Sequence, residues 1–190
     1  MRPIPILSAI ILLTGISFLS CLRDPCEGNL CENRGVCESG RCNCPVEYRG
    51  DHCKEQVTPS KIRVKAVTIT RFPDTHQGMS WDEMDGPDIF YKMSEEVYPL
   101  SQPEYLVENA DAAIDYSFNI VPFDLRYVAS PYKMELFDYE GVGIPAKKMG
   151  ELSFTPYASD NGFPATIILD DGGPIAFRLE VEYVFPKEMD

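Results

Sequence analysis

The spacing of the cysteines constrains this chain more than any other feature. Six of the seven cysteines lie between Cys26 and Cys53, in the pattern C-x4-C-x5-C-x4-C-x-C-x8-C. A segment this short buries too little apolar surface to fold without cross-links, and so dense a set of thiols is typical of disulfides in an oxidising compartment. The cysteines therefore predict a small, secreted, disulfide-rich module, while their spacing alone leaves the pairing open.

The pattern resembles that of an epidermal growth factor (EGF)-like module over about residues 24–56, with the cysteine framework in residues 26–56. Gly35 precedes the third cysteine by two residues, and Tyr48 to Cys53 is similar to the aromatic-x-Gly-x-x-Cys ending of that family. The resemblance implies the pairs Cys26–Cys37, Cys31–Cys42 and Cys44–Cys53. The alternative is a zinc knuckle, in which Cys42, Cys44 and their neighbours bind metal.

The N-terminus has the layout of a secretory signal. Arg2 precedes an apolar stretch, residues 4–13, that is too short to span a membrane. Leu19-Ser20-Cys21 resembles a bacterial lipobox, which implies cleavage before Cys21 and its lipidation, with palmitate among the acyl groups. If the other six cysteines form disulfides, Cys21 has no partner among them, and a free thiol is prone to oxidation in an oxidising compartment. Lipidation would use this thiol.

We therefore expect a signal peptide at residues 1–20, a lipidated spacer at residues 21–25 and a linker at residues 57–60. The protein would be exported across the inner membrane and anchored by lipid at the bacterial cell envelope, at the outer membrane or cell surface. Ordinary secretion, with Cys21 free or paired between chains, is the alternative.

The chain is acidic, with a formal net charge of −13 at pH 7. Such a surface argues against a nucleic-acid partner and against binding to anionic lipid by bulk charge, and it is compatible with divalent cations. The expected partners are the membrane, through the lipid anchor, and an unidentified extracellular protein or glycan.

Residues 61–190 contain no cysteine and recurrent strand patterns. In residues 175–185, Phe177, Leu179 and Val181 alternate with charged residues, which is typical of a strand with one wet face. In residues 61–72 the alternation changes phase between Val64 and Val67, which predicts a β-bulge or a change of sheet. Further strands are expected at residues 88–93, 105–107, 114–121, 125–128, 132–139, 151–155 and 165–169. Eight or nine short strands predict an all-β protein whose second domain, residues 61–190, is an antiparallel eight-stranded β-sandwich.

Parts of this domain resemble the C2 fold, a calcium- and lipid-binding sandwich. Residues 81–92 are similar to its first loop and the strand that follows, residues 134–140 to the strand entering its third loop, and Lys148-Met149-Gly150-Glu151 to the exit from that loop. An EGF-like module joined to such a sandwich also resembles surface lipoproteins of Bacteroidota.

The C2 resemblance implies a calcium site. Because Ca²⁺ binds several oxygen ligands, such a site needs carboxylates that converge from two loops. The matching residues are Asp82, Asp85, Asp88, Asp138 and Glu140. Lys147 and Lys148 stand where a further carboxylate is expected, and their charge would oppose a dication. We therefore expect a weak calcium site or none, and these acids would otherwise cap turns. No other cofactor is implied.

The sequence offers little for catalysis. Neither His52 nor His76 belongs to a recognisable motif, and no metalloprotease, serine-hydrolase or phosphate-loop signature is present. Trp81 lies beside acids in an expected loop and is a candidate for stacking on a sugar, or else it packs within the domain. We expect a non-catalytic binding or structural role of the adhesion type at the cell surface. The alternatives are a carbohydrate-binding or carbohydrate-processing component, and calcium-dependent binding of a ligand or lipid through the sandwich loops.

Overall fold

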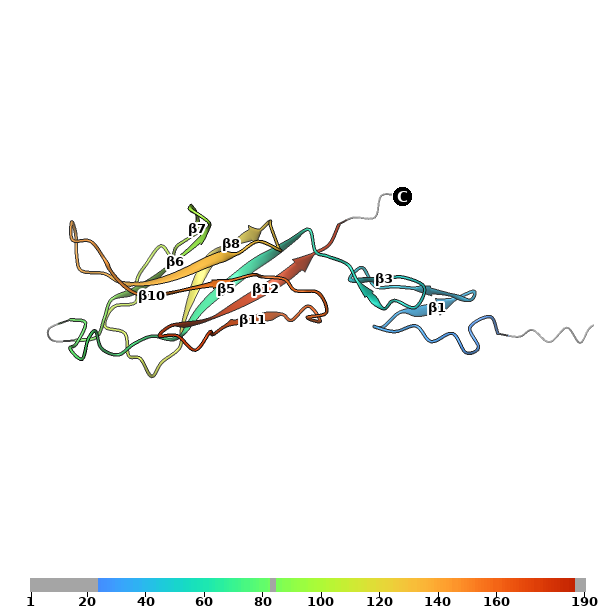
Figure 1. Cartoon of the computed structure of the whole chain (residues 1–190), viewed down its shortest axis with the longest axis horizontal. Coiled ribbons are helices and arrows are strands. Elements are labelled where there is room, and N and C mark those ends of the chain that lie inside the picture. Colours follow the sequence, from blue (N-terminus) through green and yellow to red (C-terminus); the bar gives the residue numbers. More distant parts are fainter. Residues whose placement is uncertain (1–23, 83–84, 187–190) are drawn as a thin grey trace, which may run out of the picture. The chain divides into compact units, whose positions relative to one another are not determined.

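The structure, a computed structural model, describes residues 24–82 and 85–186 (Figure 1). The predicted signal peptide, the spacer residues 21–23 and Cys21 lie outside the described residues. The chain divides into two compact units between Glu55 and Gln56. Within the described residues, no helix is long and apolar enough to cross a membrane.

The first unit is held together by three disulfides. They join Cys26 to Cys37, Cys31 to Cys42 and Cys44 to Cys53, which is the pairing that the EGF resemblance implies. With all six of these cysteines in disulfides, no Cys42–Cys44 zinc knuckle forms. Strand β1 (Val36–Glu38) pairs with β2 (Arg41–Asn43), and β3 (Tyr48–Arg49) pairs with β4 (Glu55–Gln56).

Gly35 is required in this unit because the chain passes very close to a disulfide. A Cβ atom on Gly35 would lie 2.5 Å from Sγ of Cys53, which is itself completely buried. No side chain fits in that space without a shift. The glycine that precedes the third cysteine in the sequence is therefore explained by the packing of the third disulfide.

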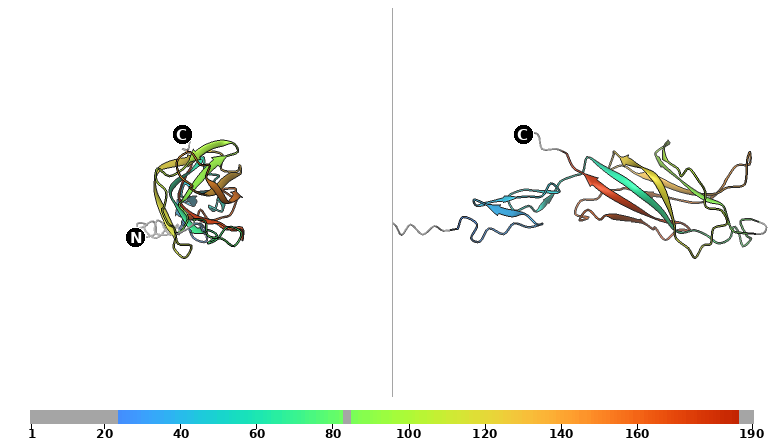
Figure 2. Two further views of the ribbon diagram at one scale, coloured as in Figure 1. Left: turned by 90° about the vertical axis from the view of Figure 1, so that its left-hand side faces the viewer. Right: turned by 180° about the vertical axis from the view of Figure 1, so that it is seen from behind.

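The second unit is an all-β sandwich of two four-stranded antiparallel sheets. One sheet has the order β10-β9-β6-β7, with β6 (Ile89–Glu95), β7 (Tyr98–Ser101), β9 (Tyr132–Asp138) and β10 (Lys147–Phe154). The other has the order β11-β12-β5-β8, with β5 (Lys61–Arg71), β8 (Tyr116–Leu125), β11 (Thr166–Leu169) and β12 (Ala176–Val184). Figures 1 and 2 show β12 beside β5 along the length of the sandwich.

The core lies between the sheets and follows the predicted alternation. Phe177, Leu179 and Val181 of β12 are buried, whereas Glu180 and Glu182, on the alternate positions, are exposed. The facing sheet contributes a matching row of fully buried side chains: Ile89, Tyr91, Met93, Met134 and Leu136. Apolar side chains on alternate positions of both sheets thus meet in one core.

The phase change in β5 is a β-bulge. In the pairing of β5 with β8, the register shifts between Val64 and Ala66 of β5. In the pairing of β5 with β12, it shifts between Glu180 and Val181 of β12, which pair with Ala66 and Val64. Both shifts place Lys65 outside the ladders. The extra residue lets Ile62 and Val64 at one end, and Val67 and Ile69 at the other, all be buried within a single strand of one sheet.

Four elements differ clearly from the prediction. Strand β7 was not expected, β8 continues to Leu125 in place of two separate strands, and β10 begins at Lys147 instead of residue 151. The expected strand at residues 105–107 is reduced to an isolated bridge between Val107 and Ile89. Pro122 lies within β8, where a proline is tolerated because β8 is an edge strand whose register shifts there.

Candidate functional site

Asp138 is the buried centre of an acidic cluster at one end of the sandwich. It is the last residue of β9, and none of its surface is exposed. Its Oδ1 atom accepts a hydrogen bond of 3.0 Å from the backbone N–H of Asp88. Its Oδ2 atom is buried and has no hydrogen-bond donor in the described part of the chain. A buried carboxylate oxygen without a donor is costly unless a proton or a cation satisfies it.

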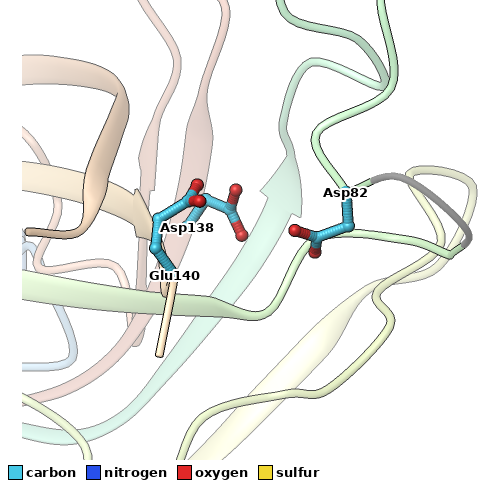
Figure 3. A group of neighbouring side chains, drawn as sticks. All are labelled: Asp82, Asp138 and Glu140. Atoms are coloured by element: carbon cyan, nitrogen blue, oxygen red, sulfur yellow. The ribbon is translucent and has the colours of Figure 1, made fainter. Parts of the chain in front are cut away.

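Two further carboxylates converge on Asp138. One carboxylate oxygen from each of Asp82, Asp138 and Glu140 lies within 4.8 Å of the other two. Figure 3 shows the carboxylate of Asp82 facing that of Asp138 across a short gap, with the carboxylate of Glu140 on the other side of Asp138. Asp82 comes from the loop after β5 and Glu140 from the loop after β9, so both loops leave the sandwich at this end.

Burial, together with nearby negative charge, raises the pKa of two of these groups. Burial, the principal cause, raises the pKa of Asp138 from 3.8 to about 6, and the charges of Asp82 and Glu140 act in the same direction. Burial also raises the pKa of Asp82, followed by repulsion from Asp88 and Glu140. The cluster therefore favours any positive charge that enters it.

Lys147 supplies one positive charge. It begins β10 opposite Asp138 in the ladder, and its Nζ atom lies 2.6 Å from Oε1 of Glu140. The close contact with Glu140 raises the pKa of Lys147. Lys148 has different partners, with Nζ 2.7 Å from Oε2 of Glu151 and 3.4 Å from Oε1 of Glu135. The sequence suggested that both lysines would oppose a cation, but only Lys147 forms an ion pair with an acid of the described cluster.

Asp85 and Asp88 line the open side of the same site. They border a pocket of about 460 Å³ whose other lining residues are Asp82, Glu108, Asn109, Tyr139, Glu140 and Gly141. Asp88 also stabilises the loop, because its Oδ1 atom accepts a hydrogen bond of 3.0 Å from the backbone N–H of Asn109. All five predicted acids therefore gather at one end of the sandwich, with Asp82, Asp138 and Glu140 closest together.

The sequence did not single out Glu108 and Asn109. They follow the isolated bridge between Val107 and Ile89, which places them beside the loop that precedes β6. Gly86 lets the segment of Glu108 and Asn109 lie close to the loop that precedes β6, because a Cβ atom on Gly86 would lie only 2.5 Å from the carbonyl oxygen of Ala110. No motif marks the segment, and the available signal was a polar pair directly after a short apolar run.

Trp81 packs within the unit. It is 6% exposed, and its Nε1–H donates a hydrogen bond of 2.8 Å to the carbonyl oxygen of Pro73. Its ring centroid lies 4.8 Å from that of His76. This arrangement leaves no open ring face for a sugar, so the predicted stacking role has no support in the geometry.

An apolar loop borders the pocket. The segment between Glu140 and Lys147 carries Val142, which is 96% exposed, and Ile144, which is 57% exposed. The loop is drawn in orange at the left of Figure 1, at the same end of the sandwich as the loop that follows β5. Exposed aliphatic side chains at a loop tip usually meet another apolar surface.

The donor set suits a hard divalent cation. Three carboxylates offer oxygen ligands, and the buried Oδ2 atom of Asp138 has no other partner in the described residues. These are the ligands that Ca²⁺ prefers, whereas nitrogen and sulfur ligands for zinc are absent from the cluster. The residues present therefore fit calcium, although Lys147 already neutralises part of the charge.

No protein-family model matches this chain, and no curated protein matches it. Among solved structures, a C2 domain is similar over 64% of this chain and 97% of its own length, at 13% identity and a TM-score of 0.41. A C2 domain of plant Extended Synaptotagmin 1 is similar over 69% of this chain and 99% of its own, at 17% identity and a TM-score of 0.43. Both likenesses concern the fold alone.

Proposed function

We propose that this chain is a non-catalytic binding protein of the bacterial cell surface, with a lipid anchor at Cys21, an EGF-like module and a C2-like binding domain. The first–third, second–fourth and fifth–sixth disulfide pairing supports the EGF-like assignment and an oxidising compartment. The signal-like residues 1–20, followed by Cys21, support export and anchoring.

The binding activity we propose is calcium-dependent and lies at the acidic end of the sandwich. The observation that carries this proposal is the wholly buried carboxylate of Asp138, which has one oxygen without a donor and shares a cluster with the carboxylates of Asp82 and Glu140. Asp82, Asp138 and Glu140 would hold the ion, with Asp85 and Asp88 nearby. The ion would supply positive charge on which an anionic or oxygen-rich ligand can bind.

We expect weak calcium binding. Three close carboxylates are fewer than the ligands of a tight site, and Lys147 competes for them. The dissociation constant should fall in the range of weak extracellular modules, roughly 10⁻⁴ to 10⁻³ M.

Calorimetric titration of residues 22–190 with calcium tests this proposal, with Asp138→Asn as the control variant. The unaltered protein should bind calcium in the expected range, and Asp138→Asn should abolish the binding. No binding at millimolar calcium would refute the cation site. Micromolar binding would contradict the expected weakness and would make calcium-dependent adhesion the leading function.

The exposed loop between Glu140 and Lys147 favours a second candidate, calcium-dependent contact with lipid. Val142 and Ile144 are exposed in the loop that begins with Glu140 and Gly141, two residues that line the acidic pocket. A dication bound in the pocket would also attract an anionic headgroup. Cosedimentation with phosphatidylcholine vesicles, with and without phosphatidylserine, tests it. Binding should require both calcium and phosphatidylserine, and Val142→Ser should weaken it. Binding unaffected by calcium, or by Val142→Ser, would exclude this candidate.

A further inference from the structure

The ion pair between Lys147 and Glu140 occupies the place where a metal ligand is needed. Nζ of Lys147 lies 2.6 Å from Oε1 of Glu140, and Glu140 shares the cluster with Asp82 and Asp138. Both side chains of the pair remain accessible enough to exchange partners, with 46% of Lys147 and 17% of Glu140 exposed. The contact is therefore close but reversible.

Lys147 is also the one cation, in the described part of the chain, that forms an ion pair with an acid of this pocket. Its charge acts on Asp82 and Asp138 as well as on Glu140. The neighbouring acids Asp85, Asp88 and Glu108 add further negative charge around it. Without Lys147 the cluster would hold converging carboxylates with no compensating positive charge nearby.

We propose that Lys147 is a tethered counter-cation, which stabilises the metal-free cluster and must leave Glu140 before a divalent cation binds. This inference rests on the proposed calcium site. An ammonium group 2.6 Å from Oε1 of Glu140 blocks that oxygen as a metal ligand and repels a dication near it. Calcium binding is then an exchange, in which a dication replaces a side-chain monocation that turns out into solvent. The weakness of the site follows from this competition.

Lys148 provides a matched control in the adjacent position. Its ammonium group pairs with Glu151 and Glu135, neither of which belongs to the cluster. The register shift between Lys148 and Gly150 follows these two lysines, and the pair point to different partners. Neutralising Lys148 therefore changes the net charge by the same amount without freeing Glu140.

Calorimetric calcium titration of four proteins tests the inference: the unaltered chain, Lys147→Met, Lys147→Arg and Lys148→Met. Lys147→Met keeps the apolar stem and should tighten calcium binding about tenfold or more. Lys147→Arg keeps the charge and should remain weak, and Lys148→Met should change the affinity by less than about threefold. Equal affinities for Lys147→Met and the unaltered chain would overturn the inference while leaving the proposed function intact. An absence of calcium binding in all four proteins would refute both.

Thermal unfolding in a chelator gives a second readout that does not depend on bound metal. Because Lys147 compensates buried charge, Lys147→Met should melt at a lower temperature than Lys148→Met when calcium is absent. Saturating calcium should then stabilise Lys147→Met more than Lys148→Met. A metal-free Lys147→Met protein as stable as Lys148→Met would contradict the counter-cation role.

Discussion

The backbone N–H of Asp88 donates a 3.0 Å hydrogen bond to Oδ1 of Asp138, and this bond connects the residue before β6 to the last residue of β9. It fixes one carboxylate oxygen of Asp138, and the other oxygen is buried and has no donor among the described residues. The fold therefore holds a charged group in a place that destabilises it unless a proton or cation is bound.

Asp138 should make the metal-free protein less stable as the pH rises. Its pKa is about 6 in the folded state against 3.8 ordinarily, so between these values the folded carboxyl keeps a proton that the unfolded chain has lost. The free energy of unfolding therefore falls through this window, by about 2–3 kcal/mol from this group. Asp138→Asn removes the carboxylate and should stabilise the chelator-treated protein by that amount at neutral pH.

Denaturant unfolding of both proteins, from about pH 4 to pH 7, measures this difference. The stability gap between Asp138→Asn and the unaltered chain should be small at the acidic end and widen as the pH rises. A gap that stays constant across the range would show that Asp138 titrates normally.

Gly86→Ala should disturb the wall of the pocket. The added Cβ would lie 2.5 Å from the carbonyl oxygen of Ala110, a backbone atom that has to move. We expect a loss of about 1–3 kcal/mol in the free energy of unfolding and weaker calcium binding. Gly150→Ala is the control, because its Cβ would meet Ile175 at 2.8 Å, away from the lining residues of the pocket. Equal effects of both variants on calcium binding would contradict the role given to Gly86.

The disulfides predict a local loss of stability in the first unit. Removing the Cys44–Cys53 bridge by the double change to serine should destabilise that unit by about 2–4 kcal/mol. The sandwich has its own core, so its melting transition should remain.

Peptide mapping of the oxidised protein should recover the three pairs, and a bridge that includes Cys21 would contradict the EGF-like assignment.

The proposed anchor predicts that the mature protein partitions into detergent. Diacylation holds a protein stably at a membrane, whereas a single chain binds marginally. Cys21→Ser should release the protein into the aqueous phase or leave the precursor uncleaved. An aqueous, mature protein with an intact Cys21 thiol would exclude the lipoprotein assignment.

The sequence predicted best the strands in which apolar and polar residues alternate in step with buried and exposed positions. In β12, every second residue from Phe177 faces the core, and in β5 the phase change marks the bulge at Lys65. Strand β7 escaped prediction because Tyr98-Pro99-Leu100-Ser101 is short, contains a proline and lies at a sheet edge. Alternation carries no signal in such a segment.

The sequence predicted which acids form the site, but it did not predict the ion-pair partners of the two lysines. Asp82, Asp138 and Glu140 follow from the resemblance of two loops, and the fold brings those loops together. The different partners of Lys147 and Lys148 depend on side-chain geometry beside a register shift, which a sequence pattern does not determine. Glu108 joins the pocket through a contact between loops far apart in the chain, and no local motif records it.

A crystal structure of the protein soaked in millimolar calcium would show directly whether the cation binds at the acidic cluster and displaces Lys147. We expect one ion bound by Oδ2 of Asp138 with carboxylate oxygens of Asp82 and Glu140, and Lys147 turned away from Glu140. An ion bound elsewhere, or a cluster without an ion in which Lys147 still contacts Glu140, would contradict it.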